Sequence, residues 1–465
     1  VLSFTRLYDE VTRKVGGRVA DIINDSDRII LMGRALYSVA NELELWGKYA
    51  SSAKFAQTLL TAITEFKTDA VMPEDLNSVA DKLDDGYLKS KVHDVALIYS
   101  AYNAVLANEF LDPQDNTERL AEDLLTNRLF ENKTVYVDSF KSFTGQQYKI
   151  IDRILNQSDD VTFSFTAPDL DYKKIDIFSG VRKTVDRILK IAENNGVTVT
   201  EPLILTEFHY ADDTMRSIES IFSDRHTDIC DNGESVTICK CANIFDEAEF
   251  TARSIRRLVR REGYRYRDFV IIARDDTKYR QAVLNACNRN GVFCFSDKRS
   301  KINNMPLTVL INSYFRLCRS YSNDVISDLL KTRLGPVSVD DASKIENYMY
   351  IWSVRGKQWL GEWKMNPSGL LAREMNENEK KELAEINAYR EKIVNSVEEF
   401  KKRFHGTPEQ MSLAVVNLVE KLNIREKMKS DFSGDDELSN DVRQCYDLTM
   451  QVLNSLVKCM PDAPT

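Results

Sequence analysis

The run TVYVD at residues 134–138 decides the fold, because it is a short β-branched and aromatic stretch that ends in a carboxylate. Residues 161–165 (VTFSF) repeat the alternation, and a helical pattern over 142–156 lies between the two runs. β-Branched and aromatic residues favour strands. Strand, helix and strand in this order form the unit of a parallel sheet, so the sequence predicts an α/β core here.

A second unit of the same kind follows. Residues 235–242 (SVTICKCA), 269–273 (FVIIA) and 292–295 are expected to be strands, with helices over 247–261 and 278–289 between them. The run FVIIA is entirely apolar, as is typical of a parallel strand that is buried on both faces. The fold class predicted is therefore α/β with two parallel-sheet cores.

Large helical blocks accompany these cores. Phe4, Leu7, Tyr8 and Val11 recur at i, i+3, i+4 and i+7, which predicts a helix at the start of the chain. Helical patterns continue to about residue 128 and resume after about residue 306. We expect helical blocks near 20–128 and 301–465.

Composition points to a folded protein with more than one domain, since 465 residues exceed what one core usually serves. A net charge of −9 argues mildly against nucleic-acid binding but leaves room for a local basic groove. No apolar run could span a membrane, and there is no signal peptide. We therefore expect a cytoplasmic protein without a membrane partner. Val1 in place of an initiator Met predicts a piece of a longer protein.

The cysteines lack metal-site spacing. None forms a Cys-x-x-Cys pair, and only four histidines are available, so no zinc or iron–sulfur site is expected. Reduced cysteines are typical of a cytosolic protein. They are Cys230, Cys239, Cys241, Cys287, Cys294, Cys318, Cys445 and Cys459.

Nucleotide chemistry has little support. A phosphate loop needs Gly-x-x-x-x-Gly-Lys-Ser/Thr, and Gly47-Lys48 lacks the upstream glycine and the hydroxyl. Asp138, at the end of an apolar strand, is placed like the magnesium-holding carboxylate of a Walker B motif. Ser139 follows it, however, where hydrolysis needs a glutamate to orient water. We interpret the pair as a degenerate Walker B-like position; alternatively, Asp138 caps the following segment.

Two features could contact nucleic acid. Residues 253–267 carry seven arginines, which could form a phosphate-binding stripe, although the solvated face of an amphipathic helix is the favoured interpretation. Phe4 could stack on a base and Arg6 could grip a phosphate or a guanine edge. Since Phe4 shares a helical face with Leu7 and Val11, core packing is the alternative.

In order, several stretches resemble the AddB (RexB-like) subunit of the bacterial AddAB helicase–nuclease. The resemblance covers most of the chain and becomes thin after about residue 365. Its stretches are VLSFTRL (1–7), VYVDSFKSFTGQQ (135–147), EAEFTARSIRRLVRREGYRYRDFVIIARD (247–275), FSDKR (295–299), LLKTRLGPVS (329–338) and ENYMYIWSVRGKQW (346–359).

The resemblance implies a superfamily 1 helicase fold, with two RecA-like domains and helical insertions, that no longer works as a motor. A first RecA-like domain is expected at 1–168, with a helical insertion at about 20–128. A connecting segment at 169–233, a second RecA-like domain at 234–300 and a helical insertion domain at 301–465 follow.

The resemblance also implies a role and partners. In this family an AddA helicase–nuclease partner forms a heterodimer with AddB and supplies ATP-driven unwinding at double-stranded DNA ends. AddB adds an exonuclease domain with magnesium and an iron–sulfur cluster. Its helicase-like part scans single-stranded DNA for the recombination hotspot, Chi. The phosphate loop is expected before Val1 and the nuclease motifs after Thr465, so we expect no cofactor and no catalytic residue in this sequence.

In the family, positions matching Phe4, Arg6 and Phe140 contact the single strand. Relatives often have an aromatic residue three places after the arginine, where this chain has Asp9. A carboxylate there would repel phosphate, so the recognised DNA sequence differs or scanning is lost. Two alternatives stay open: a scaffold that docks AddA without touching DNA, and an ATP-binding helicase or nuclease whose motifs lie outside this sequence.

Overall fold

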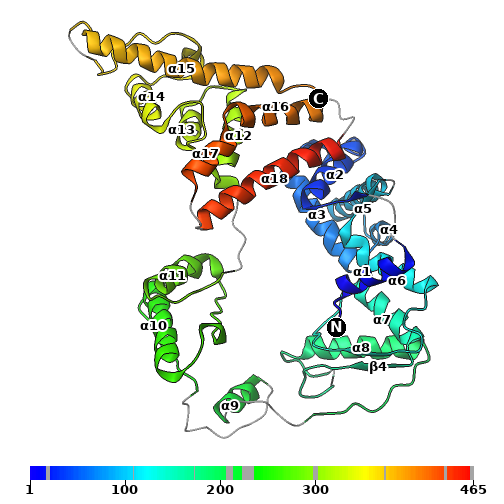
Figure 1. Cartoon of the computed structure of the whole chain (residues 1–465). Helices are drawn as coiled ribbons and strands as arrows, with labels where there is room; N and C mark the ends of the chain where they lie inside the picture. Colours follow the sequence, from blue (N-terminus) through cyan, green and yellow to red (C-terminus); the bar gives the residue numbers. More distant parts are fainter. Residues whose placement is uncertain are drawn as a thin grey trace. The chain divides into compact units, whose positions relative to one another are not determined.

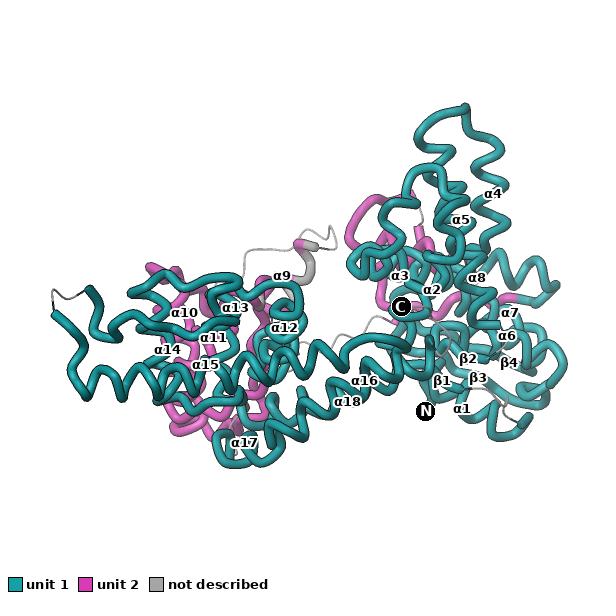
Figure 2. Tube along the Cα trace, turned by 90° about the horizontal axis from the view of Figure 1, so that it is seen from above, with its two compact units in different colours: residues 1–164, 188–198, 301–465 teal, residues 165–187, 199–300 magenta. Residues whose placement is uncertain are grey.

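The computed structural model describes residues 1–16, 21–107, 109–171, 173–205, 213–222, 235–296, 302–370, 373–433 and 437–460. The chain divides into two compact units (Figures 1 and 2). Unit 1 contains residues 1–164, 188–198 and 301–465, and unit 2 contains residues 165–187 and 199–300. Most of the described residues are helical, and two small parallel sheets accompany the helices.

The predicted helices at the chain start and over about 20–128 are confirmed. A short parallel pairing of β1 (Asp21–Ile22) with β2 (Phe110–Leu111), which the sequence did not predict, closes the base of this block. The helices are α1 (Phe4–Val15), α2 (Asp25–Ser38), α3 (Ala53–Thr68), α4 (Pro73–Ala80), α5 (Tyr87–Leu106) and α6 (Asn116–Thr126), with 3-10 turns η1 (Gly47–Tyr49) and η2 (Pro113–Asp115).

The first strand–helix–strand unit is also confirmed. β3 (Thr134–Val137) pairs in parallel with β4 (Asp160–Phe163), and α7 (Gly145–Gln157) connects them. Val135 lies opposite Val161 in the register. Both valines pack against a cluster that includes Val11 of α1 and Ile150 of α7, so the sheet and α1 share one small core.

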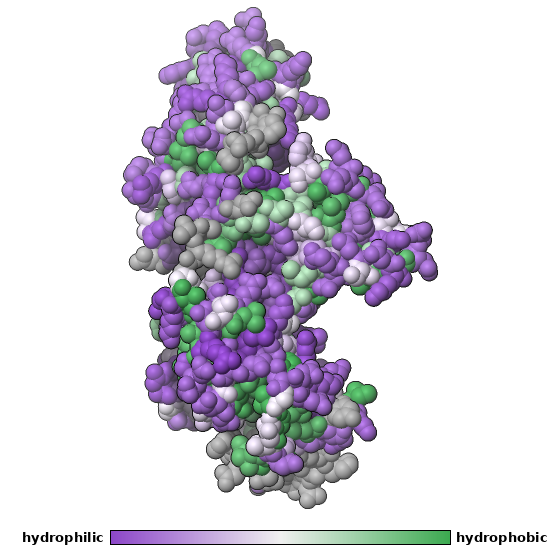
Figure 3. Space-filling view, turned by 90° about the vertical axis from the view of Figure 1, so that its right-hand side faces the viewer, coloured by the Kyte–Doolittle hydropathy of each residue, from purple (hydrophilic) through white to green (hydrophobic). Residues whose placement is uncertain are grey.

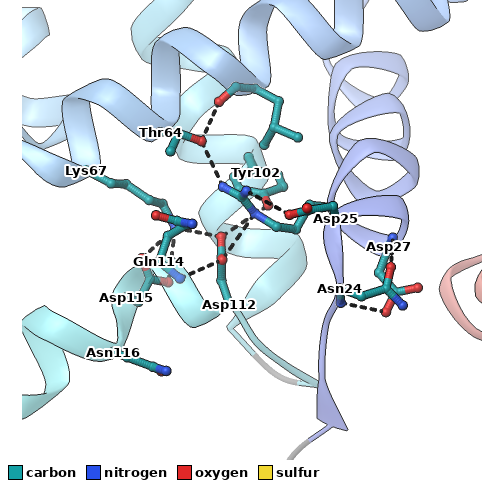
Figure 4. A network of polar contacts seen from close by, with 12 residues as sticks. Asn24, Asp25, Asp27, Thr64, Lys67, Tyr102, Asp112, Gln114, Asp115 and Asn116 are labelled. Atoms are coloured by element: carbon teal, nitrogen blue, oxygen red, sulfur yellow. Dashed lines mark hydrogen bonds and ion pairs between the residues drawn. The ribbon is translucent and has the colours of Figure 1, made fainter. Parts of the chain in front are cut away.

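A polar network lies inside the helical block (Figure 4). Asp112 has no solvent exposure, and it holds Arg28 Nε at 3.2 Å and Lys67 Nζ at 3.5 Å. Lys67 also donates to Asp115 at 2.7 Å, and burial raises the pKa of that carboxyl above its usual range. Opposite charges in contact offset the cost of burial, so this network ties α2, α3 and η2 together rather than forming an open site.

The second helical block, over 302–459, confirms the helical expectation after residue 306. Its core is apolar, with Leu310, Ile345 and Val397 fully buried. The elements are η4 (Ile302–Asn304), α12 (Pro306–Leu317), α13 (Asn323–Lys331), α14 (Val339–Trp352), η5 (Gly356–Leu360), α15 (Glu377–Arg403), α16 (Pro408–Lys421), α17 (Ile424–Asp431) and α18 (Glu437–Cys459).

The last helix, α18, connects the two helical blocks of unit 1. It packs on α12 and α16 and also on α2. At its end Cys459 is fully buried in the core of the first block, and the Cys459 carbonyl accepts a hydrogen bond from Arg34 at 3.3 Å. The two helical blocks are therefore joined by side-chain packing as well as by the chain.

Unit 2 contains the predicted helices but not the predicted strands. α10 (Ile244–Glu262) and α11 (Asp276–Arg289) pack through small side chains such as Ala252 and Ala286. The other elements of the region are α8 (Ser179–Asn194), which ends in unit 1, α9 (Asp213–Phe222) and η3 (Tyr266–Asp268).

The expected strands at 235–242, 269–273 and 292–295 carry no strand pairing in the described part of the chain, so that prediction is wrong for this structure. Side-chain alternation nevertheless survives. Val292 is 7% exposed and lies beneath the helices, whereas Phe293 is 88% exposed. Strand pairing needs backbone partners on a neighbouring strand, and an apolar sequence alone does not supply them.

The surface is largely polar. On the face drawn in Figure 3, hydrophilic residues predominate and apolar residues form separate patches. Among the helices of the described ranges, none is both long and apolar enough to cross a membrane.

Candidate nucleic-acid interface

Helix α1 presents two of the three predicted DNA-contact residues. Ser3 caps the helix by accepting a hydrogen bond from the Arg6 backbone N–H at 3.3 Å. Val11 is 2% exposed and anchors α1 to the small core, against which Phe4 is partly buried. The Phe4 ring thus sits at the edge of the core, with part of its surface open.

The loop between β3 and α7 presents the third. After Asp138 the backbone turns at Ser139, whose φ of 67° is left-handed and unusual for a residue with a side chain. Helix α7 then begins at a reciprocal cap, in which Thr144 and Gln147 exchange side-chain-to-backbone hydrogen bonds at 3.0 and 3.3 Å. Phe140 and Phe143 lie in the short segment between these two constraints.

The structure brings Phe4 and Phe140 together. Their ring centroids are 5.6 Å apart in an edge-to-face arrangement. Phe143 supports both rings, at 6.2 Å from Phe4 and 4.9 Å from Phe140, and Tyr148 lies 5.7 Å behind Phe143. We call these four residues the aromatic cluster. Phe143 and Tyr148 are buried, whereas Phe4 and Phe140 are half-buried, so the outer pair is held by a buried inner pair.

Sequence reasoning missed the inner pair. The spacing Phe140-x-x-Phe143 was available as a signal, but nothing in the sequence indicated that Phe4 would meet both rings. The Arg6 side chain is exposed and makes no contact with any residue in the described ranges, and Asp9 is exposed on the same helix. Arg6 is therefore available to an anion near the cluster.

Asp138 lies at the carboxyl end of β3, as expected, but its surroundings do not fit a magnesium–nucleotide site. The hydroxyls of Ser164 and Ser139 donate hydrogen bonds to its carboxylate and hold its pKa below the usual range; the Ser139 contact is 3.2 Å. No group of three metal-ligating side chains occurs in the described part of the chain. Because Ser164 follows β4, the carboxylate links the ends of the two strands.

These features define a helical protein with a small parallel α/β core and an aromatic pair at its edge. Residues 1–219 match the family described as "ADDB, N-terminal", so this part of the chain belongs to that family. The predicted resemblance to AddB-type subunits is thereby confirmed.

Three relatives align with 99% of this chain, and each is named as the B subunit of an ATP-dependent helicase/deoxyribonuclease. Those of Clostridium tetani and Acetivibrio thermocellus are 28% identical, and that of Thermoanaerobacter sp. is 27% identical. The chain covers 42%, 42% and 41% of these proteins, which is about two fifths of their length. The homology therefore extends through both helical blocks.

Proposed function

We propose that this chain is the non-motor, helicase-like part of an AddB-type subunit, in a complex that processes double-strand DNA breaks for recombinational repair. In this proposal it carries two inactivated RecA-like domains, works with an AddA-type helicase partner and scans single-stranded DNA for a hotspot sequence. The support is the similarity to relatives whose names describe a helicase/deoxyribonuclease, together with the aromatic pair.

One observation carries the DNA-binding part of the proposal. Phe4 and Phe140 come from distant parts of the sequence, yet their half-open rings lie 5.6 Å apart. A base can stack on an exposed ring regardless of its sequence, and such a contact contributes about 1–3 kcal/mol. Two adjacent rings on a buried aromatic support form a preorganised surface, because binding does not need to order them.

Arg6 supplies the polar part of the proposed contact. Its guanidinium, which has no ion-pair partner among the described residues, lies on the same first turn of α1 as Phe4. A guanidinium can hold a phosphate or make two hydrogen bonds to a guanine. Phosphate contact makes binding depend on salt, whereas guanine contact makes it depend on base sequence, so the two modes are separable.

The test uses the variants Phe4→Ala, Arg6→Ala and Phe140→Ala, bound to hotspot-bearing and scrambled oligonucleotides. Binding is measured for the chain alone and for the complex with its helicase partner. We expect each Phe→Ala change to weaken binding by about 5- to 150-fold, the equivalent of about 1–3 kcal/mol. Phe245→Ala, which removes a ring that is 63% exposed on α10, is the matched control and should bind as the parent does.

The two alternatives predict different results. If the chain only docks the partner, all three variants bind DNA as the parent does, and the scanning proposal fails. If the chain is part of a nucleotide-driven motor, Asp138→Ala lowers ATP turnover. We expect no turnover from this chain, since Ser139 cannot orient a water molecule for attack.

A further inference from the structure

Helix α10 and the turn after it are rich in arginine. Residues 253–267 contain seven arginines, no lysine and one acidic residue. Two of these arginines are engaged in ion pairs: Arg253 contacts Glu249 at 2.9 Å, and Arg265 contacts Asp268 at 2.8 Å. These two are accounted for by the fold itself.

The arginines at 256, 257, 260 and 261 are not. Positions i, i+1, i+4 and i+5 fall on one side of a helix, and we call this set the arginine face. The side of α10 that packs toward α11 instead carries Ala252 and Ile255. Arg257, Arg260 and Arg261 are exposed, and none of the four forms an ion pair with a residue in the described ranges.

Helix energetics explain only half of the arginine face. Arg260 and Arg261 lie in the last turn, where cations interact favourably with the helix dipole. Arg256 and Arg257 lie one turn earlier, beyond the reach of that effect. Each stands four residues before another arginine, and a like-charge pair at this spacing costs the helix about 0.2–0.5 kcal/mol. An anionic ligand across the face would remove this repulsion.

The residue type indicates which anion. Arginine presents a planar set of donors that matches phosphate in a two-point contact, which lysine cannot reproduce. Tyr264, which is 50% exposed, follows the face directly after the helix-ending Gly263, and its ring is 5.7 Å from that of Phe269. Cations beside an exposed aromatic ring are typical of surfaces that bind single-stranded nucleic acid.

We propose that the arginine face binds the phosphate backbone of DNA, as a second contact separate from the aromatic cluster. The proposal rests on the proposed function in that DNA is the ligand, but it assigns a different role: the aromatic cluster stacks on bases, and the arginine face contributes affinity that does not depend on sequence. The backbone can come from the single strand or from the duplex, and both present the same phosphates.

The test measures how DNA affinity depends on salt concentration. The parent chain is compared with the variant R256Q/R257Q/R260Q/R261Q, using single-stranded and duplex oligonucleotides of the same length. Each lost phosphate contact lowers the slope of log affinity against log salt by about 0.7 for a single strand and about 0.9 for a duplex. Loss of all four therefore lowers the single-strand slope by about 3. The strand type with the larger change identifies the source of the backbone.

A matched control separates this effect from a change in net charge. K380Q/K381Q/K401Q/K402Q removes four exposed positive charges from α15 in the other unit, and it should leave the slope near that of the parent. Glutamine and arginine have similar helix propensities, so α10 should keep its helicity, which circular dichroism checks. If the arginine variant has the same slope as this control, the proposal is overturned.

Failure of this proposal is distinguishable from failure of the proposed function. A normal salt slope in the arginine variant, with weakened binding by Phe140→Ala, rejects the arginine face alone. A reduced slope in the arginine variant, with parental binding by the three cluster variants, supports the arginine face and rejects base stacking by the aromatic cluster.

Discussion

At the scale of single residues, Asp112 shows how much one buried carboxylate can organise. It contacts Arg28, Lys67 and the Tyr102 hydroxyl, and it accepts the Gln114 backbone N–H at 3.0 Å (Figure 4). Its partners come from four separate elements of the first helical block. The carboxylate is therefore the common acceptor around which these elements are arranged.

We expect Asp112→Ala to destabilise the fold by about 3–5 kcal/mol, because it leaves buried cations without a counter-charge. Asp25→Asn is the matched control: its carboxylate is 89% exposed and lies 3.8 Å from Arg28. Exposed ion pairs contribute about 1 kcal/mol or less, so this change should be close to neutral. Denaturant unfolding measures both, and equal effects would contradict the assignment of Asp112 as the centre of the network.

The aromatic cluster illustrates the same scale on the functional side. Phe143 and Tyr148 are buried and touch each other, and they contact no predicted site residue outside the cluster. Their contribution is to hold Phe4 and Phe140 in place. The periodicity of α1 correctly indicated that Phe4 packs on the core, and the structure adds that the same ring remains partly open.

At the scale of elements, the approach of α7 to α3 depends on Gly145. A Cβ atom added there would lie 2.2 Å from the carbonyl oxygen of Asp69, which caps the end of α3. This contact involves backbone on both sides, so neither group can move by a side-chain rotation. The start of α7 and the end of α3 are therefore adjusted to each other at this residue.

We expect Gly145→Ala to destabilise unit 1 by about 1–3 kcal/mol through overpacking. Gly33→Ala is the control, because nothing lies within 4 Å of a Cβ added at that position of α2. Alanine in a helix is favoured over glycine by about 0.5–1 kcal/mol, so this change should be stabilising. Thermal unfolding should move in opposite directions for the two variants, and a shift in the same direction would contradict the predicted clash.

At the scale of the whole molecule, α18 joins the two helical blocks of unit 1. Lys458 contacts Asp21 at 3.5 Å and donates to the Ile22 carbonyl at 3.4 Å, while Cys459 is buried beside α2. Burial raises the pKa of the Cys459 thiol to about 12. The thiol is therefore both shielded and protonated as long as α18 stays docked.

Thiol labelling reports this docking. We expect Cys459 to react far more slowly than the exposed Cys239, and Arg34→Ala with Lys458→Ala to accelerate it by about 3- to 10-fold per lost hydrogen bond. Cys445, which is fully buried in the second helical core, should stay protected in that variant. Simultaneous exposure of both cysteines would indicate unfolding instead of undocking, and equal labelling of Cys459 and Cys239 in the parent would contradict the contact.

The sequence by itself determined the local elements. Side-chain periodicity reports which face of a segment is apolar, so α1, α7, α10, the strand pair β3–β4 and both helical blocks could be predicted. Residue chemistry was likewise readable, including the carboxylate at the end of β3 and the excess of arginine in α10.

Only the tertiary structure decided which of these segments meet. Backbone pairing of 269–273 needs neighbouring strands, and the apolar run could not reveal that these are absent from the described part of the chain. The contact of Phe4 with Phe140, the burial of Asp112 with its two cations and the docking of α18 on α2 are likewise contacts between distant residues. Such contacts depend on the path of the whole backbone, which local periodicity does not encode.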